Sequence, residues 1–446
     1  MKFKRKIYNN LLEWKKNRSG KTALLIEGAR RVGKSFVVSE FGKQEYKSHV
    51  IIDFSVPRPL TLDAILNAAY DLDGLFNRIS IEYKVQLFSR ETLIVFDEVQ
   101  LCPKARQLIK HLVADGRYDY IETGSLVSLK TNIEDILIPS EEEHITLNPM
   151  DFEEFCWAMS DEVTVGFARE CYLKQKALGA IHDTVLKRYC EYLCVGGMPQ
   201  AVEEYVKTKD YSRTDKVKRS ILDLYRNDIG KFAGNNAAKV RSIFNEIPGQ
   251  LTKKDKKYSL ACLDKSARMR TYEDSFDWLS DAKIVNPCYN ATDPTVGMSL
   301  SSDFATRKVY MSDTGLLLSH ALQMDNVTES ELYKAIFTGE VYFNNGMIAE
   351  NAVAQSLVAS GKSLFFYSRH NRETHRNEIE VDFLIRKDGA VTPLEVKSGK
   401  YRSHASLDKF SMKFADRIGK RIILYTKDVA ERDGIIHLPI YMAMFL

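Results

Sequence analysis

The stretch LLIEGARRVGKS at residues 24–35 constrains the fold of this chain more than any other. The apolar run Ala23–Ile26 predicts a buried strand, and the residues after it match the pattern G-x-x-x-x-G-K-[ST]. In this pattern backbone N–H groups surround a phosphate, Lys34 reaches the terminal phosphates and the Ser35 hydroxyl binds Mg²⁺. A helix predicted over Phe36–Phe41 would direct the positive end of its dipole at the same anion. Strand, loop and helix occur in the required order, which favours a nucleotide-binding loop over a glycine-containing turn that matches by chance.

A second feature is the apolar strand predicted over Glu91–Gln100, which ends in an acidic pair. This is typical of a Walker B strand: Asp97 would hold Mg²⁺, usually through water, opposite Ser35. Glu98 would orient and activate the water that attacks the γ-phosphate. The alternative is a solvated acidic turn, which the position after a phosphate-binding loop disfavours.

The next predicted strand, Tyr118–Ser125, ends in polar residues beside the acidic pair. Thr123 and Ser125 are candidate sensors of the γ-phosphate, and Ser125 is preferred. Lys34 and Glu98 are thus the predicted catalytic residues of this half, and Ser35 and Asp97 its predicted Mg²⁺ ligands. The predicted nucleotide-binding residues are Gly28, Ala29, Arg30, Arg31, Val32, Gly33, Lys34, Ser35, Phe36, Asp97 and Ser125.

Strands and helices alternate along the first 150 residues, which predicts an α/β fold with a parallel sheet covered by helices on both faces. The nucleotide would then lie at the carboxyl ends of the strands. The other predicted strands are His49–Ser55 and His144–Met150, and the other predicted helices are Lys2–Lys16, Leu60–Ser89 and Pro103–Ala114.

Composition limits the remaining possibilities. A chain of 446 residues is long enough for about three domains. Its net charge of +4 is too small to indicate nucleic-acid binding by itself. Seven cysteines without a C-x-x-C pair indicate reduced thiols. The N-terminus lacks a signal-peptide core and no apolar stretch is long enough to span a membrane, so we expect a cytoplasmic protein that has no membrane partner.

The middle of the chain reads as helical from Asp151 to about residue 240, with GGMPQAV forming a tight connection between helices. Arg226 is either a γ-phosphate finger or, in the favoured interpretation, part of an ion pair. Residues 241–330 suggest a winged-helix arrangement of short helices and a hairpin, which can place a helix in the DNA major groove. A basic cluster there would either contact phosphates or form a solvated loop: Lys253, Lys254, Lys256, Lys257, Arg268 and Arg270.

The last segment carries a second set of candidate catalytic residues. Two strands predicted over Glu378–Ile385 and Thr392–Val396 form a hairpin, so that Asp382 is followed by Glu395 and Lys397 in a D…E-x-K pattern. In nucleases of the restriction-endonuclease fold, such carboxylates hold Mg²⁺ and the lysine activates water. Glu350, on a helix predicted before the hairpin, would be a third metal ligand.

GARRVGKS, LIVFDEVQ, NPMDFEEF, GGMPQAV, LYRND, SDTGLL, GMIAENAVAQSL and VDFLI…PLEVKSG occur in this order. Together they resemble a prokaryotic family of AAA-type ATPases that carry a C-terminal domain of unknown function. The resemblance implies an AAA+-like P-loop core (1–150), a helical lid (151–240), a winged-helix-like domain (241–330) and a restriction-endonuclease-like domain (331–446). Many family members have an arginine finger after the sensor strand, where this chain reads ILIPSEEEH without arginine.

These observations favour an ATP- and Mg²⁺-dependent ATPase whose nucleotide state controls a C-terminal half that binds or cleaves DNA. The alternative is a nucleotide-gated interaction protein with slow hydrolysis and an inactive nuclease-like fold. A small-molecule kinase is disfavoured because the acidic pair suits water activation. Assembly into a homo-oligomer is possible, although the missing arginine leaves it open.

Overall fold

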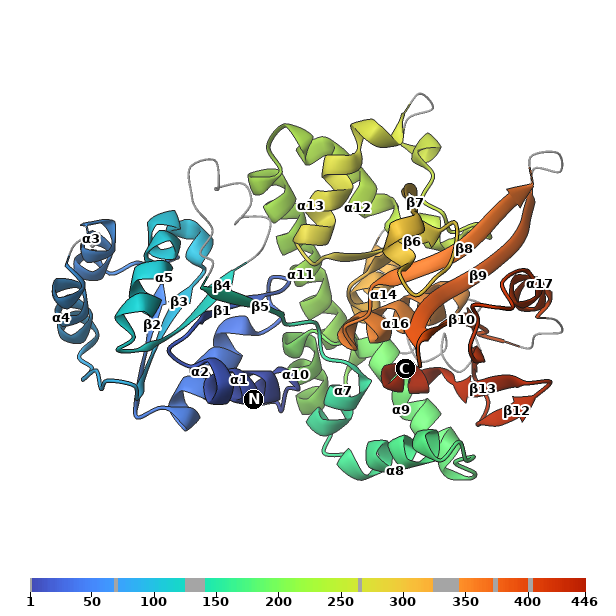
Figure 1. The fold of residues 1–446 in the computed structure, drawn as a ribbon, viewed down its shortest axis with the longest axis horizontal. Coiled ribbons are helices and arrows are strands. Elements are labelled where there is room, and N and C mark those ends of the chain that lie inside the picture. Colours follow the sequence, from blue (N-terminus) through green and yellow to red (C-terminus); the bar gives the residue numbers. More distant parts are fainter. Residues whose placement is uncertain are drawn as a thin grey trace. The chain divides into compact units, whose positions relative to one another are not determined.

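The computed structural model describes residues 2–67, 71–124, 141–263, 267–323, 345–371, 376–399 and 404–446. The chain divides into two compact units (Figure 1). The first contains residues 2–148 together with 281–283, and the second contains 149–280 and 284–446.

The first unit is built around a five-stranded sheet of order β2-β3-β4-β1-β5 in which every pair of neighbours is parallel. Parallel strands need crossover helices, and these cover both faces of the sheet (Figure 1). Helices α1 and α2 pack on one face, and α3, α4 and α5 on the other. The bounds are β1 (Ala23–Glu27), β2 (Ser48–Asp53), β3 (Thr92–Asp97), β4 (Asp119–Gly124), β5 (Glu142–Thr146), α1 (Ile7–Arg18), α2 (Lys34–Glu45), α3 (Pro59–Asn67), α4 (Leu72–Tyr83) and α5 (Pro103–Asp115). The predicted α/β fold with a parallel sheet is confirmed.

The second unit begins with the expected helices. A capping box starts α7, because the Asp151 side chain accepts from the Glu154 amide while the Glu154 carboxylate accepts from the Asp151 amide. Gly196 and Gly197 join α9 to α10, and a Cβ on Gly197 would lie 2.0 Å from the Met150 carbonyl oxygen, so only glycine fits there. These helices are α7 (Phe152–Ala158), α8 (Glu162–Leu173), α9 (Ile181–Val195), α10 (Pro199–Thr208), α11 (Tyr211–Phe232) and α12 (Ala237–Thr252).

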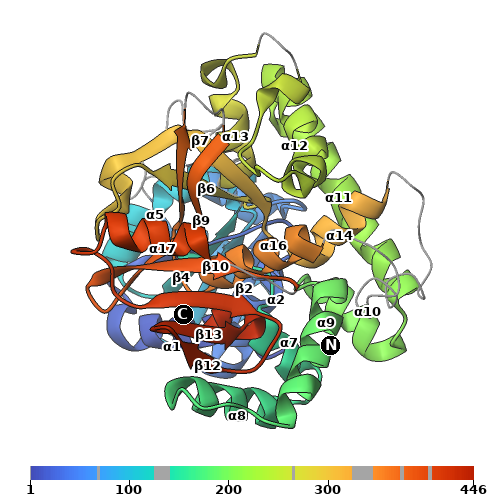
Figure 2. The same cartoon turned by 90° about the vertical axis from the view of Figure 1, so that its right-hand side faces the viewer.

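The rest of this unit forms an eight-stranded mixed sheet of order β12-β13-β11-β10-β9-β8-β6-β7. Figure 2 shows its strands following one another from β7 and β6 to β13 and β12. The strands are β6 (Val285–Ala291), β7 (Ser302–Met311), β8 (Leu364–Asn371), β9 (Arg376–Lys387), β10 (Ala390–Val396), β11 (Arg421–Tyr425), β12 (Ala430–Arg432) and β13 (Ile435–Pro439). The helices are α13 (Glu273–Asp281), α14 (Thr314–Gln323), α16 (Asn345–Ala359) and α17 (Ala405–Lys413).

The hairpin expected as the wing of a winged-helix domain is the antiparallel pair β6–β7. It does not stand apart, because β6 pairs in parallel with β8 and so joins the sheet that was assigned to the C-terminal domain. A winged helix is therefore not confirmed. Within the described part of the chain, no helix combines the length and the apolar character needed to cross a membrane.

Candidate functional site

The phosphate-binding pattern occupies the turn between β1 and α2, in the predicted order of strand, loop and helix. A Cβ on Gly28 would lie 2.4 Å from the Leu147 carbonyl oxygen, so the turn needs glycine to pass this close to the chain beyond β5. Gly33, at the N-cap of α2, has φ of 99°, and Arg31 has φ of 69°. The loop thus holds the left-handed backbone conformations that curl N–H groups around an anion.

Inside this turn the Lys34 side chain folds over the loop. Its Nζ donates to the Gly28 carbonyl oxygen at 2.9 Å and to the Ala29 carbonyl oxygen at 3.2 Å. Burial lowers the pKa of Lys34, and the nearby Glu98 and Asp97 carboxylates oppose that shift. An ammonium group that donates to carbonyl oxygens can exchange them for phosphate oxygens. Of the other loop residues, Ala29 and Val32 are buried, whereas the side chains of Arg30, Arg31 and Phe36 are exposed.

Two hydroxyl groups converge on one oxygen of Asp97 at the end of β3. Ser35 Oγ donates to Asp97 Oδ1 at 2.8 Å, and Thr123 Oγ1 donates to the same atom. Thr123 reaches it because β4 runs parallel to β3, with Phe96 paired to Glu122. A hydroxyl and a carboxylate are hard oxygen ligands of the kind that Mg²⁺ accepts, so Ser35 and Asp97 fit the predicted metal role.

Thr123 also connects the acidic pair to the neighbouring strand, because the Glu98 amide donates to its Oγ1 at 3.2 Å. Glu98 itself has φ of 54°, and Gln100 Nε2 donates to its carboxylate at 2.5 Å. The structure thus indicates that Thr123 positions the acidic pair, whereas from the sequence it was only a candidate sensor of the γ-phosphate. Ser125, the preferred sensor, lies outside the described residues.

Arg5 is a part of this site that the sequence did not single out. It is 6% exposed, and its guanidinium donates to the Val32 carbonyl oxygen at 3.1 Å and to the Asn148 carbonyl oxygen at 2.6 Å. It therefore ties the phosphate-binding loop to the chain after β5. The only signal for it was its place in a basic N-terminal run that also contains Lys2, Lys4 and Lys6, so the sequence could not distinguish Arg5 from these lysines.

On the α5 side of the sheet, directly before the phosphate-binding loop, lies a polar cluster that the sequence also missed; its carboxylates and Arg106 are buried, whereas His144 is partly exposed. Glu142 Oε1 accepts from Arg106 at 2.8 Å and from His144 Nε2 at 2.7 Å, and Glu27 Oε1 lies 3.2 Å from His144 Nδ1. Hydrogen bonds to Glu142 and then to Glu27 raise the pKa of His144 to about 9. Burial, and then the neighbouring Glu142, raises the pKa of Glu122 well above its usual value. These shifts favour the charged form of the His144 imidazole and the protonated form of the Glu122 carboxyl group.

In the second unit, β9 and β10 form the predicted hairpin around Asp388 and Gly389, whose φ values of 51° and 77° suit a two-residue turn. Its register brings Glu395 next to Asp382 on the neighbouring strand. Asp382 Oδ2 accepts from the Val396 amide at 2.9 Å, and Lys397 Nζ donates to Glu395 Oε1 at 2.7 Å. The D…E-x-K residues are therefore brought together as expected.

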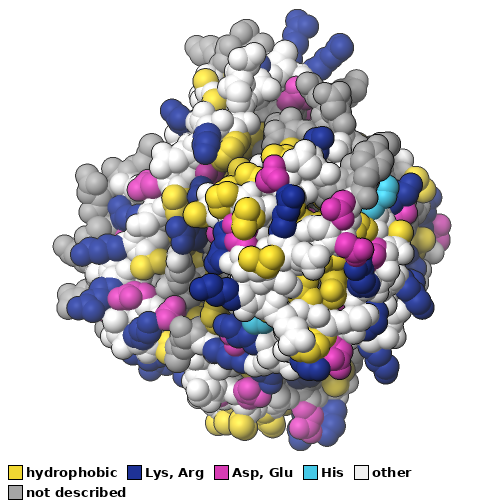
Figure 3. Space-filling model, turned by 90° about the vertical axis from the view of Figure 1, so that its left-hand side faces the viewer, with side chains coloured by type: hydrophobic (Ala, Val, Ile, Leu, Met, Phe, Trp, Pro, Cys, Tyr) yellow, Lys and Arg dark blue, Asp and Glu magenta, His cyan; other side chains and the backbone are white. Residues whose placement is uncertain are grey.

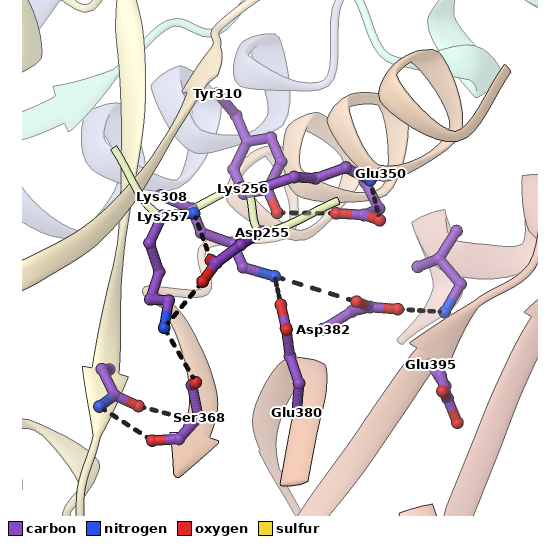
Figure 4. A network of polar contacts seen from close by, with 12 residues as sticks. Asp255, Lys256, Lys257, Lys308, Tyr310, Glu350, Ser368, Glu380, Asp382 and Glu395 are labelled. Atoms are coloured by element: carbon purple, nitrogen blue, oxygen red, sulfur yellow. Dashed lines mark hydrogen bonds and ion pairs between the residues drawn. The ribbon is translucent and has the colours of Figure 1, made fainter. Parts of the chain in front are cut away.

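The Glu350 carboxylate, from α16, lies on the other side of Asp382 from Glu395 in the view of Figure 4. Burial and the Glu350 charge raise the pKa of Asp382 to about 6. Even so, nowhere in the described ranges do three or more His, Cys, Asp or Glu side chains form a group that could hold a metal ion. Glu350, Asp382 and Glu395 are near enough to interact electrostatically, but they do not form such a group.

Instead, two lysines that are distant in the sequence lie beside these carboxylates and form ion pairs in this region. Lys308 of β7 is fully buried, with its Nζ 3.0 Å from Glu380 Oε1 and 3.9 Å from Asp382 Oδ1. Lys256 forms an ion pair with Glu350, whose other oxygen accepts from the Tyr310 hydroxyl at 3.2 Å (Figure 4). Neither lysine was predicted to lie here.

The basic residues predicted as one cluster in the middle segment therefore lie in different environments. Lys253 and Lys254 are exposed, as are Arg268 and Arg270, whereas Lys256 turns inward onto Glu350. On the face drawn in Figure 3, basic and acidic side chains are interspersed and do not gather into one large field. Arg226 donates to Asp223 at 2.9 Å, which confirms the ion pair favoured for it.

Three family models match parts of the chain. Residues 20–156 match an AAA domain, residues 186–328 match a domain of unknown function (DUF8612), and residues 345–443 match another (DUF4143). No curated protein matches the chain.

Among solved structures, the Walker-type ATPase paby2304 of Pyrococcus abyssi is 14% identical with a TM-score of 0.40, over 72% of this chain and 96% of that one. The Aeropyrum pernix Orc1 protein in complex with DNA is 12% identical with a TM-score of 0.28, over 72% and 93%. Drosophila ORC bound to DNA is 14% identical with a TM-score of 0.26, over 71% and 93%. Similarities this low leave the AAA-domain match and the loop geometry as the basis for assigning the first unit. Both support an AAA-type P-loop ATPase domain that binds ATP.

Proposed function

We propose that the first unit hydrolyses ATP in a Mg²⁺-dependent reaction. The observation that carries this is the convergence of the Ser35 and Thr123 hydroxyls on one oxygen of Asp97, beside Lys34 and Glu98. It supports roles for Ser35 and Asp97 in metal binding, for Lys34 in phosphate binding and for Glu98 as the base, since all four lie at the carboxyl end of one parallel sheet.

Each residue has a distinct part in this reaction. Lys34 would exchange the loop carbonyl oxygens for the terminal phosphates, and Ser35 and Asp97 would hold the metal. Mg²⁺, when bound, supplies positive charge that neutralises the developing charge on the phosphates. Glu98 accepts the proton of the attacking water, and Thr123 fixes both acidic residues through the Asp97 carboxylate and the Glu98 amide.

Phosphate release with and without Mg²⁺ tests this proposal. We expect Lys34→Ala to abolish turnover and to weaken ATP binding. Lys43→Ala is the matched control, because Lys43 lies on the same helix, is exposed and pairs only with Glu40 in the described contacts. Equal turnover by Lys34→Ala and wild type would overturn the proposal.

For the second unit we propose a nuclease-like site for DNA, controlled by the nucleotide state of the first, in a cytoplasmic protein. The observation that favours it is the D…E-x-K arrangement of Asp382, Glu395 and Lys397, with Glu350 nearby. The competing proposal is a nucleotide-gated interaction protein. It is favoured by Lys308 and Lys256, which neutralise the same carboxylates without a metal.

Mg²⁺-dependent cleavage of branched, single-stranded and duplex DNA, with and without ATP, separates the two. An ATP-controlled nuclease predicts cleavage that Asp382→Ala abolishes and Lys34→Ala changes. Asp416→Ala, at a side chain that is 79% exposed, should cleave as wild type does. ATP hydrolysis without any DNA cleavage by the wild type would instead support the interaction protein.

A further inference from the structure

The first turn of α2 exposes a large aromatic side chain directly after the phosphate-binding loop. Phe36 follows Lys34 and Ser35 and is 46% exposed. The next two residues, Val37 and Val38, point into the core, so Phe36 lies on the side of α2 that faces away from the sheet. An exposed aromatic ring gains free energy when a flat apolar surface covers it.

The N-terminal segment borders the surface around this ring. Lys2 Nζ lies 2.9 Å from Glu40 Oε2, and Arg5 donates to the Val32 carbonyl oxygen at 3.1 Å. Glu40 and Val32 lie four positions after and four positions before Phe36, so the segment is fixed on both sides of it. Because Phe36 keeps its exposure, the segment borders the ring without covering it.

The position of the ring relative to the phosphates indicates which part of a ligand can cover it. Lys34 lies inside the loop and Ser35 donates to Asp97, so the terminal phosphates and the metal belong on the Asp97 side of α2. A nucleotide bound in this way extends its sugar and base away from Asp97. Phe36 faces away from the sheet next to the same loop, on the side that is left for the sugar and base.

We propose that the Phe36 ring stacks on the base of the bound nucleotide. The proposal rests on the ATP-dependent function proposed for the first unit, and it adds the part of the site that recognises the base. Stacking on an aromatic ring tolerates different bases, because every base has a flat π-face. The ring therefore selects nucleoside triphosphates over free triphosphate without choosing strongly among the bases.

Calorimetric binding of two ligands to the full-length chain in the presence of Mg²⁺ tests the proposal. The ligands are a non-hydrolysable ATP analogue and inorganic tripolyphosphate, which lacks a base. We expect Phe36→Ala to weaken binding of the analogue by about 5- to 150-fold and to leave tripolyphosphate binding unchanged. Leu12→Ala is the matched control, because Leu12 is an apolar residue on α1 that is 37% exposed, and its loss should change the binding of neither ligand.

A second variant distinguishes stacking from a change in the loop itself. Phe36→Trp keeps an aromatic ring, and the fluorescence of its new indole reports on contact with a base. Relative to wild type, we expect this fluorescence to change when the analogue is added but not when tripolyphosphate is added.

The binding data separate this proposal from the function on which it rests. Equal weakening of both ligands by Phe36→Ala, or no weakening of either, overturns the stacking role and leaves ATP hydrolysis by the first unit standing. Failure of the wild type to bind the analogue overturns the proposed function as well.

Discussion

Replacement of Thr123 by valine removes one hydroxyl group and little volume, so it isolates the role of that group. In the structure this hydroxyl donates to Asp97 Oδ1 and accepts from the Glu98 amide at 3.2 Å. Thr123→Val breaks both contacts, and it leaves the contacts of Lys34 with the loop carbonyl oxygens in place.

The size of the effect follows from these two contacts. A hydrogen bond to a charged group is worth about 1.5–3 kcal/mol, and one between neutral groups about 0.5–1.5 kcal/mol. If mainly the charged contact is lost from the transition state, kcat falls by about 10- to 150-fold, at roughly 1.4 kcal/mol per factor of ten. The ATP affinity should change much less, because the phosphate-binding loop keeps its geometry.

Steady-state phosphate release at saturating Mg²⁺ and ATP, together with an ATP-binding measurement, gives kcat and affinity separately. Thr123→Ser keeps the hydroxyl and should retain most of the activity. Thr92→Val controls for stability, since Thr92 is equally buried at the opposite end of β3, where it accepts from the Phe88 amide and shares a hydrogen bond with Ser48. An unchanged kcat in Thr123→Val, or an equal loss in Thr123→Ser, would refute the positioning role.

Two further predictions concern stability. A Cβ on Gly315 would lie 2.5 Å from the backbone of Gly196, so Gly315→Ala should lower the free energy of unfolding by about 1–3 kcal/mol or more in urea denaturation. Gly166→Ala, in an open helical position, should leave it unchanged or raise it by up to about 1 kcal/mol; equal effects of the two would contradict the close approach. Because its bonds to Glu142 raise the pKa of His144 to about 9, this contribution to stability is complete below about pH 6.5 and is lost as pH rises through about 9. The difference in urea midpoint between wild type and His144→Gln should therefore shrink over that range, and a difference that grows with pH would reject the assignment.

The strand, loop, helix and acidic pair of the candidate nucleotide site could be predicted from the sequence because each of these parts is local. The loop, the helix after it and the acidic pair each follow directly from a strand, and the order of those segments already implies a parallel sheet. The role of Thr123 depends in addition on the pairing of β3 with β4. The sequence could therefore identify Thr123 as a candidate but could not predict its contacts with Asp97 and Glu98.

The second unit was harder to predict because its contacts join distant segments. Lys308 meets Glu380 only because β6 pairs with β8, and nothing in the sequence TRKVYM around Lys308 marks it as the partner of a carboxylate. The same pairing explains why the expected winged-helix domain was not confirmed. A short hairpin has the same sequence pattern whether it ends a small domain or extends a larger sheet. Lys256 is separated from Glu350 by 94 residues, and a run of lysines normally indicates a solvated loop.

The central claim, that the first unit hydrolyses Mg²⁺-bound ATP with Glu98 as the base, is tested most directly by phosphate release from Glu98→Gln. The amide keeps the shape and the hydrogen-bonding capacity of the side chain, and it cannot accept the proton of the attacking water. We expect this variant to bind ATP with Mg²⁺ as tightly as wild type and to release almost no phosphate. Hydrolysis at the wild-type rate by Glu98→Gln would contradict it.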